Sequence, residues 1–172
     1  MKFLVATLFF FAFLSLSNAQ VEWLTWEEAI ERQQTEPRKI VVDLYTDWCG
    51  WCKRMDKTTF SDPKLGAYIN ENFYPVKFNA ESRDPVTFGG KEYTFKRSGQ
   101  RGYHELAAML TRGNLSYPTT VFLNEDGSII QPVPGYQTAP DFERIVTYFS
   151  EDHHRKTPWD TYQRGYRSFL NN

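Results

Sequence analysis

The sequence predicts an α/β protein in which a central mixed sheet has helices on both faces. Short apolar runs rich in β-branched residues alternate with segments whose apolar residues recur at helical spacing, as expected for strands that alternate with helices. Two runs near the end flank an Asp126-Gly127 turn and should pair as antiparallel strands, which makes the sheet mixed. The chain has 172 residues, of which 17% are aromatic, so it can fill the core of one domain.

Residues 1–19 have the pattern of a secretory signal peptide. A basic start at Lys2 precedes an almost wholly apolar stretch, residues 3–16, and small residues end at Ala19, which predicts cleavage before Gln20. A retained membrane anchor is the alternative, but about 14 apolar residues are fewer than the roughly 20 that a membrane-spanning helix needs. We therefore expect an exported protein, either periplasmic or secreted.

The charge balance gives no sign of a nucleic-acid partner. The chain carries 20 Lys and Arg against 21 Asp and Glu, and loss of Lys2 with the signal peptide would leave a formal charge of about −2. No internal repeat or linker marks a second folded unit. The sequence thus predicts one domain over residues 20–151 and a C-terminal tail over residues 152–172, and we expect the protein to be a monomer.

The first predicted helix and strand follow the expected signal peptide. Thr25, with Glu28 three residues later, forms a capping box that opens a helix to about Thr35. The nearly continuous apolar run over residues 40–45 is rich in β-branched residues, which is typical of a strand buried on both faces.

Two helices and a strand come next. One helix should begin close to Cys49, directly after the first strand, and end near Thr58. Another should begin at Pro63, since Asp62 can cap it and proline suits a first helical turn. The apolar run over residues 74–79 then predicts the second strand.

The second half of the chain completes the sheet and adds an insertion. Residues 86–96 predict an inserted hairpin around Gly89-Gly90, and a helix follows whose apolar stripe begins at Tyr103. Residues 119–130 are two strands joined by the Asp-Gly turn, and Thr138 should cap the last helix of the domain.

The C-terminal tail carries aromatic residues at helical spacing. A capped helix is expected to start at residues 157–160 and to dock on its own domain. An aromatic face for a partner protein is the alternative. The residues with this spacing are Trp159, Tyr162, Tyr166 and Phe169.

Both cysteines lie in "TDWCGWCKR", residues 46–54. Cys49 is expected where the first strand gives way to a helix, whose amino end offers unpaired N–H groups and a partial positive charge. Both features stabilise a thiolate, the nucleophilic form of cysteine. Cys52 lies three residues later on the same helical face. The spacing therefore indicates a redox pair in which Cys49 attacks a substrate disulfide and Cys52 resolves the mixed disulfide.

The chain offers little for a metal site. Zinc takes four Cys and His ligands, or three with a water molecule. Beyond the two cysteines the chain has only His104, His153 and His154, none at ligand-like spacing from the motif. A purely structural disulfide is another alternative, but closing so short a loop contributes only about 2 kcal/mol. We therefore expect a redox-active disulfide with no metal and no other cofactor.

Residues around the motif resemble those of the thioredoxin superfamily. Trp48 stands directly before the first cysteine, as in the family's WCxxC pattern. Asp43, in the first strand, matches the family's buried acid, and Lys77, in the next strand, matches the lysine that approaches this acid. Tyr117 and Pro118 match the loop that carries the family's cis-proline.

The stretch over residues 43–65 looks most like the reductase domain at the carboxyl end of the bacterial transmembrane disulfide-interchange proteins, and like related exported thioredoxin-like proteins. This resemblance implies a thioredoxin-like three-layer sandwich, to which the hairpin insertion and the extra C-terminal helix are additions. It also implies an exported thiol–disulfide oxidoreductase of the reductase or isomerase type, which acts on protein thiols and disulfides. Such an enzyme needs an electron donor, for which a membrane-bound protein is one candidate.

The residues leave open the direction of electron flow and the choice between catalysis and binding. Trp51 stands where thioredoxin has a proline, and residues between the cysteines affect the reduction potential, so the direction of electron flow is not fixed. The alternative class of function is a non-catalytic binding module, gated by the redox state of the cysteine pair.

The acid and the lysine have physical roles in this interpretation. A carboxyl group of Asp43 buried with few partners should have a raised pKa, which suits a proton acceptor for Cys52. Lys77, if it lies close, would moderate that shift. The simpler alternatives are a hydrogen-bonded core group for Asp43 and a solvated strand lysine for Lys77.

The expected substrate-binding surface surrounds the cysteines. A cis-proline there would leave the N–H and carbonyl of Tyr117 free to pair with an extended substrate segment. A plain turn at Pro118 and packing of Trp48 beneath the motif are the alternatives. The expected surface comprises Trp48, Gly50, Trp51, Tyr117 and Pro118.

Overall fold

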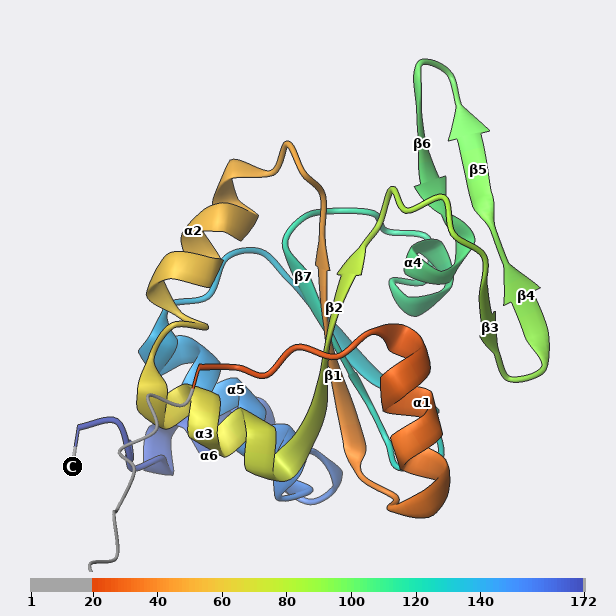
Figure 1. Ribbon diagram of the computed structural model, residues 1–172. Coiled ribbons are helices and arrows are strands. Elements are labelled where there is room, and N and C mark those ends of the chain that lie inside the picture. The colour runs from red at the N-terminus through yellow and green to blue at the C-terminus, as the bar shows by residue number, and fades with distance from the viewer. Residues whose placement is uncertain (1–19, 172) are drawn as a thin grey trace, which may run out of the picture.

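The computed structural model describes residues 20–171 (Figure 1), so the expected signal peptide lies outside the described residues. Within that range no helix has both the length and the hydropathy to cross a lipid bilayer. The helices are α1 (Trp26–Thr35), α2 (Gly50–Thr58), α3 (Pro63–Asn72), α4 (Glu105–Leu110), α5 (Ala139–Ser150), the 3₁₀-helix η1 (His153–Arg155) and α6 (Trp159–Gly165). The strands are β1 (Lys39–Tyr45), β2 (Phe73–Asn79), β3 (Val86–Phe88), β4 (Lys91–Tyr93), β5 (Phe95–Ser98), β6 (Arg101–His104), β7 (Thr119–Leu123) and β8 (Ile129–Pro134).

A four-stranded mixed sheet forms the centre of the fold. Its strand order is β2-β1-β7-β8, in which β1 and β2 are parallel and β7 is antiparallel to both β1 and β8. The register places Asp43 of β1 opposite Lys77 of β2 on one side and opposite Thr120 of β7 on the other. The mixed sheet expected from the sequence is therefore confirmed, and Asp43 lies on one of its two central strands.

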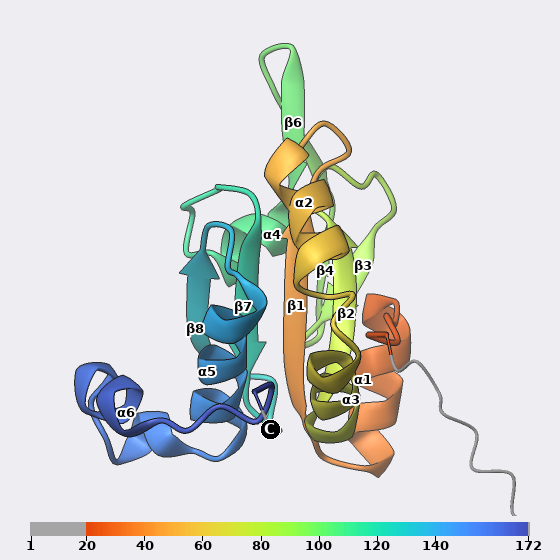
Figure 2. The ribbon, with the colours of Figure 1, turned by 90° about the vertical axis from the view of Figure 1, so that its left-hand side faces the viewer.

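Helices cover both faces of this sheet. In Figure 1, α1 and α4 lie on one side of the strands and α2, α3 and α5 on the other, an arrangement that Figure 2 shows from the side of α2. Val42 and Leu44 of β1 belong to the buried cluster under α1 and α4, whereas Val41 belongs to the cluster under α2, α3 and α5. Since successive side chains of a strand point to opposite faces, Asp43 points to the same face as Val41, towards α2.

The helix starts are confirmed where a side-chain cap was expected. Thr25 and Glu28 form the capping box at α1, Asp62 accepts hydrogen bonds at the start of α3, and Thr138 caps α5. Each of these side chains satisfies backbone N–H groups that the first helical turn leaves unpaired.

The insertion differs from its prediction. It contains two hairpins, β3–β4 and β5–β6, where one was expected over residues 86–96. Tyr103 lies in β6 and not in the helix that follows. That helix, α4, starts later because His104 occupies its N-cap, where Nδ1 accepts a hydrogen bond from the backbone N–H of Leu106. Figure 1 shows the β5–β6 hairpin projecting beyond the sheet on the side of α4.

The tail packs against its own domain, but its helix is shorter than the aromatic spacing predicts. Helix α6 ends at Gly165, so Phe169 lies beyond it and stacks on Tyr68 of α3, with 4.9 Å between ring centroids. The prediction of a side-chain cap at the start of this helix is also wrong. Pro158 occupies the N-cap position, and the helix has no capping hydrogen bond from a side chain.

Glu143 of α5 holds the end of the tail. Its side chain is fully buried, and its carboxylate accepts hydrogen bonds from Ser168 Oγ at 2.7 Å, from the backbone N–H of Leu170 at 3.0 Å and from that of Phe169. The tail is thus fixed by polar as well as aromatic contacts.

Candidate redox site at the CxxC motif

Cys49 and Cys52 lie at the amino end of α2 and are joined by a disulfide bond. Cys49 is the N-cap residue, and its Sγ accepts a hydrogen bond from the backbone N–H of Cys52 at 3.1 Å. The sulfur thus takes the place of the side-chain oxygen that usually caps a helix. Both this N–H and the positive end of the helix dipole favour negative charge on the Cys49 sulfur.

The disulfide is shielded, whereas the residues beside it are open. Cys49 is 5% exposed and Cys52 is 2% exposed, while Trp48 and Trp51 are 54% and 55% exposed. Gly50, between them, faces open space. The exposure of Trp48 rules out packing beneath the motif. A substrate would therefore approach Cys49 across exposed aromatic rings.

A tyrosine and an arginine that the sequence interpretation missed extend this surface. The ring of Tyr136, just after β8, lies 5.4 Å from that of Trp51. The Arg54 guanidinium lies over both rings, at 5.2 Å from Trp51 and 5.4 Å from Tyr136. Arg54 could have been found, because it follows Trp51 by three residues and so shares its side of the helix. Tyr136 gives no such signal, because only the tertiary fold brings it to α2.

The loop before β7 lies on the other side of the motif. The Tyr117-Pro118 peptide bond is cis, as the resemblance implies, and the Tyr117 ring meets the Trp48 ring edge-on at 6.1 Å. Pro118 is buried, and its carbonyl accepts a hydrogen bond from the N–H of Gly135 at 2.8 Å. The backbone N–H and carbonyl of Tyr117 have no hydrogen-bond partner within residues 20–171. Both groups are therefore available to an extended polypeptide.

Asp43 is the buried acid of the site. Its side chain is almost inaccessible, and burial raises its pKa to about 6, although the Lys77 ammonium group opposes the shift. Lys77 Nζ lies 2.9 Å from Asp43 Oδ2, whereas Oδ1 has no partner among the described residues. A carboxyl group that titrates near pH 6 can take up and release protons close to neutral pH, as general acid–base chemistry requires.

Lys77 is a paired, half-buried lysine, so the solvated alternative is wrong. Its Nζ bonds to Asp56 of α2 as well as to Asp43, and it lies over the Trp23 ring at 4.9 Å. Burial lowers the pKa of Lys77, but the two carboxylates outweigh burial and leave the pKa raised. The lysine therefore stays charged between the sheet and α2.

A family model described as a thioredoxin-like domain matches residues 26–150. The chain belongs to the thioredoxin-like family. The matched region of this thioredoxin-like protein includes the cysteine pair, both hairpins of the insertion and all of α5, whereas the tail lies outside it.

Curated relatives of this thioredoxin-like chain are much longer proteins. The uncharacterized protein B0495.5 of Caenorhabditis elegans is 24% identical over 143 residues, which cover 83% of this chain and 16% of that protein. The thiol:disulfide interchange protein DsbD of Pectobacterium atrosepticum is 28% identical over 116 residues, which cover 66% of this chain and 17% of that protein. The chain thus spans about a sixth of the length of these two relatives.

Solved structures share the fold. A thioredoxin-fold protein from Helicobacter pylori superimposes with a TM-score of 0.55 at 19% identity, over 74% of this chain and 79% of that chain. A candidate disulphide-isomerase from Bacteroides thetaiotaomicron superimposes with a TM-score of 0.53 at 26% identity, over 76% of this chain and 93% of that chain. The thioredoxin-like three-layer sandwich expected from the sequence is therefore confirmed.

Asp56 is a further member of the thioredoxin-like site that the sequence interpretation missed. It follows Cys52 by four residues, so both side chains lie on the same side of α2, and its carboxylate bonds to Lys77. This spacing was the signal that could have found it. The lysine between Asp43 and Asp56 ties the sheet to the helix that carries the cysteines.

The histidines considered as metal ligands lie in structural positions. His104 caps α4, and His153 and His154 belong to η1 after α5. Among residues 20–171, no three His, Cys, Asp or Glu side chains lie close enough together to hold a metal ion.

Proposed function

We propose that this thioredoxin-like protein is an exported thiol–disulfide oxidoreductase that reduces disulfides in protein substrates. The observation that carries the proposal is the position of Cys49 at the N-cap of α2, where its sulfur meets the Cys52 N–H. Once the disulfide is reduced, this position favours the thiolate, which is the form that attacks a disulfide.

Two exchange steps account for one turnover. The Cys49 thiolate attacks one sulfur of the substrate disulfide; that S–S bond breaks, a mixed disulfide forms, and the other substrate sulfur leaves and takes up a proton. Asp43 then accepts the proton of Cys52, and the Cys52 thiolate attacks Cys49 Sγ. The Cys49–Cys52 bond forms, the bond between Cys49 and the substrate breaks, and the second substrate sulfur leaves as a thiolate that takes up the proton held by Asp43. The substrate gains two electrons and two protons, and the protein loses them.

The reducing direction and the export have separate supports. The resemblance of residues 43–65 to the reductase domain of disulfide-interchange proteins supports exchange in the reducing direction, and the pattern of residues 1–19 supports export. In an oxidising compartment each turnover leaves the protein as a disulfide, so a dithiol electron donor must reduce it again. We propose a membrane-bound protein for that role, and a monomer as the active form.

Reduction of insulin by dithiothreitol tests the activity. The mature chain, from Gln20 onward, should accelerate precipitation of the insulin chains over the rate with dithiothreitol alone. Cys49→Ser should abolish the acceleration, and Cys52→Ser should accumulate mixed disulfides with the substrate. No acceleration by the wild-type protein would contradict the proposal.

A non-catalytic binding module is the second candidate, favoured by the low exposure of Cys49 beside the exposed rings of Trp48 and Trp51. The two candidates differ in what the Cys52→Ser variant captures. Covalent complexes with several proteins, absent from Cys49→Ser, support catalysis. A single partner held without a covalent bond, and equally by both variants, supports the binding module.

A further inference from the structure

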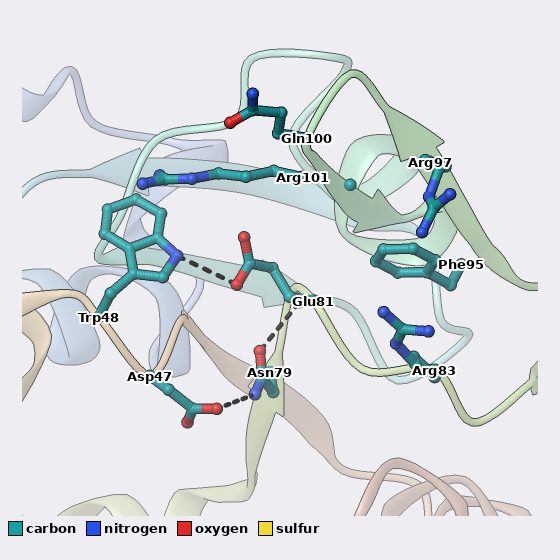
Figure 3. A pocket seen from close by; sticks show the side chains of 10 residues that line it. Asp47, Trp48, Asn79, Glu81, Arg83, Phe95, Arg97, Gln100 and Arg101 are labelled. Carbon is teal, nitrogen blue, oxygen red and sulfur yellow. Dashed lines mark hydrogen bonds between the residues drawn. The ribbon is translucent and has the colours of Figure 1, made fainter.

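A polar pocket of about 330 Å³ lies between the CxxC loop and the β5–β6 hairpin (Figure 3). Trp48, directly before Cys49, lines one side, and Arg97 and Arg101 of the hairpin line the other. The Arg101 guanidinium lies over the Trp48 ring, 4.8 Å from its centroid. The pocket therefore borders the residue next to the expected nucleophile.

Three arginines of this pocket lack carboxylate partners. Arg83, Arg97 and Arg101 are exposed and form no ion pair within residues 20–171. Two of them contact aromatic rings: Arg101 lies over Trp48, and the Arg83 guanidinium lies 5.1 Å from the centroid of Phe95. A guanidinium group presents a planar fork of N–H donors that matches a carboxylate. Three such groups around one pocket therefore favour an anionic ligand.

Two carboxylates also line the pocket, and each accepts a hydrogen bond from a neutral donor. Glu81 accepts a hydrogen bond from Trp48 Nε1 at 3.0 Å, and Asp47 accepts one from Asn79 Nδ2 at 3.3 Å. Figure 3 shows Asp47 and Asn79 on the side of the pocket that is away from the hairpin, with no arginine between their two side chains. Three arginines against two carboxylates leave a formal charge of +1 in the pocket, whereas the whole chain carries −1.

The hairpin wall of the pocket depends on one glycine. A Cβ atom on Gly102 would lie 2.2 Å from Cζ of Phe95 and 2.4 Å from the carbonyl oxygen of Lys96, so no larger residue fits without moving the ring. Figure 3 shows the Phe95 ring between the side chains of Arg83 and Arg97. The ring thus gives the Arg83 guanidinium an apolar surface to lie on at the edge of the pocket.

We infer that this pocket binds an acidic segment of the polypeptide whose disulfide is exchanged at Cys49. The inference rests on the proposed function, because it states which protein substrates the site prefers. Carboxylate side chains of the substrate pair with Arg83 and Arg97, while the backbone beside the substrate cysteine lies along Trp48 and the open N–H and carbonyl of Tyr117. Complementary charge then raises the rate of encounter and fixes the orientation of the substrate.

Two disulfide-bonded peptides of equal length test the inference, one with Asp and Glu beside each cysteine and one with Asn and Gln. The mature wild-type chain is compared with the double variant Arg83→Gln, Arg97→Gln. The control is Lys91→Gln, Arg167→Gln, which removes the same charge at exposed positions outside the pocket. We expect the first double variant to lower kcat/KM for the acidic peptide by about tenfold, through KM, and to leave the neutral peptide unchanged. The control should resemble the wild type with both peptides.

The other outcomes separate this inference from the proposed function. If the wild type reduces both peptides equally well, the pocket does not select and the inference is wrong, while the proposed function stands. If the wild type reduces neither, the proposed function is wrong, and calorimetry with a cysteine-free acidic peptide decides the inference. If the wild type binds this peptide and the Arg83, Arg97 variant binds it about tenfold more weakly, the pocket is an acidic-peptide site. If the wild type does not bind the peptide, the inference is wrong.

A further measurement, with oxidised glutathione as the substrate, distinguishes a polypeptide ligand of the pocket from a small carboxylate ligand. Oxidised glutathione carries carboxylates beside its disulfide but no extended acidic chain. We expect its reduction to be independent of Arg83 and Arg97. A loss as large as that of the acidic peptide would overturn the assignment to a polypeptide.

Discussion

The backbone N–H of Cys52 donates a hydrogen bond to the Sγ of Cys49 at 3.1 Å. The residue that caps α2 is therefore also the residue that the sequence motif marks as the nucleophile. Behind this helix, Lys77 joins the buried Asp43 to Asp56. The lysine thus links the sheet to the helix that carries the cysteine pair.

Asp43→Asn should change how stability depends on pH. The pKa of Asp43 is raised from 3.8 to about 6 in the folded protein, so the folded state holds this proton more tightly than the unfolded state. The contribution of Asp43 to stability is therefore fully present below about pH 4 and is lost as the pH rises through about 6. From about pH 3 to about pH 8 the wild type should lose roughly 3 kcal/mol relative to the variant. Urea unfolding of the oxidised proteins measures this, and parallel pH profiles would contradict the raised pKa.

Lys77→Met should destabilise the protein at alkaline pH. Methionine keeps an apolar stem over the Trp23 ring but removes the cation, which leaves the Asp43 carboxylate buried without compensation. We expect a loss of about 3 kcal/mol at about pH 8 and a smaller loss below about pH 6, where Asp43 takes up a proton. Adding Asp43→Asn should restore most of the stability. Failure of the second substitution to rescue the first would show that the lysine acts through other contacts.

Glu143→Ala should release the end of the tail. The substitution leaves the backbone N–H groups of Phe169 and Leu170 without their acceptor, so we expect a destabilisation of about 2 kcal/mol and faster tryptic cleavage at Arg167. Glu31→Ala, at an exposed position of α1, is the control and should change stability by less than about 0.5 kcal/mol. Equal cleavage of the two variants would mean that aromatic packing alone holds the tail.

The reduction potential of the cysteine pair tests the direction of electron flow. Equilibration with glutathione, followed by quantification of the oxidised fraction, should give a value near about −270 mV, that of thioredoxin. A value near about −120 mV, that of a strong oxidant, would reverse the proposed direction.

The sequence predicted the parts of the fold whose signals are local. Thr25, Asp62 and Thr138 cap helices through residues two or three positions away, so a single stretch of sequence contains the whole signal. The β5–β6 hairpin was missed because its strands are largely polar and exposed and pair only with each other, so no alternation of burial marks them. The predicted tail helix was too long. Phe169 keeps the sequence spacing of a helix, but it lies beyond the end of α6 and stacks on Tyr68.

The same distinction applies to the site. The spacing of Cys49 and Cys52 and the resemblance to thioredoxin pointed to Asp43 and Lys77, and the register of β1 and β2 does place these two side by side. The contact of Arg101 with Trp48 could not be predicted, because it depends on a hairpin that the sequence did not reveal.

The rate at which iodoacetamide alkylates Cys49 at different pH values tests the central claim most directly. The measurement uses the reduced Cys52→Ser variant, which keeps the backbone N–H that faces the Cys49 sulfur. We predict a midpoint at or below about pH 7, because the amino end of α2 stabilises the thiolate. A midpoint at about 8.5, that of an ordinary thiol, or a rate too slow to measure, would contradict the claim that this helix end activates Cys49.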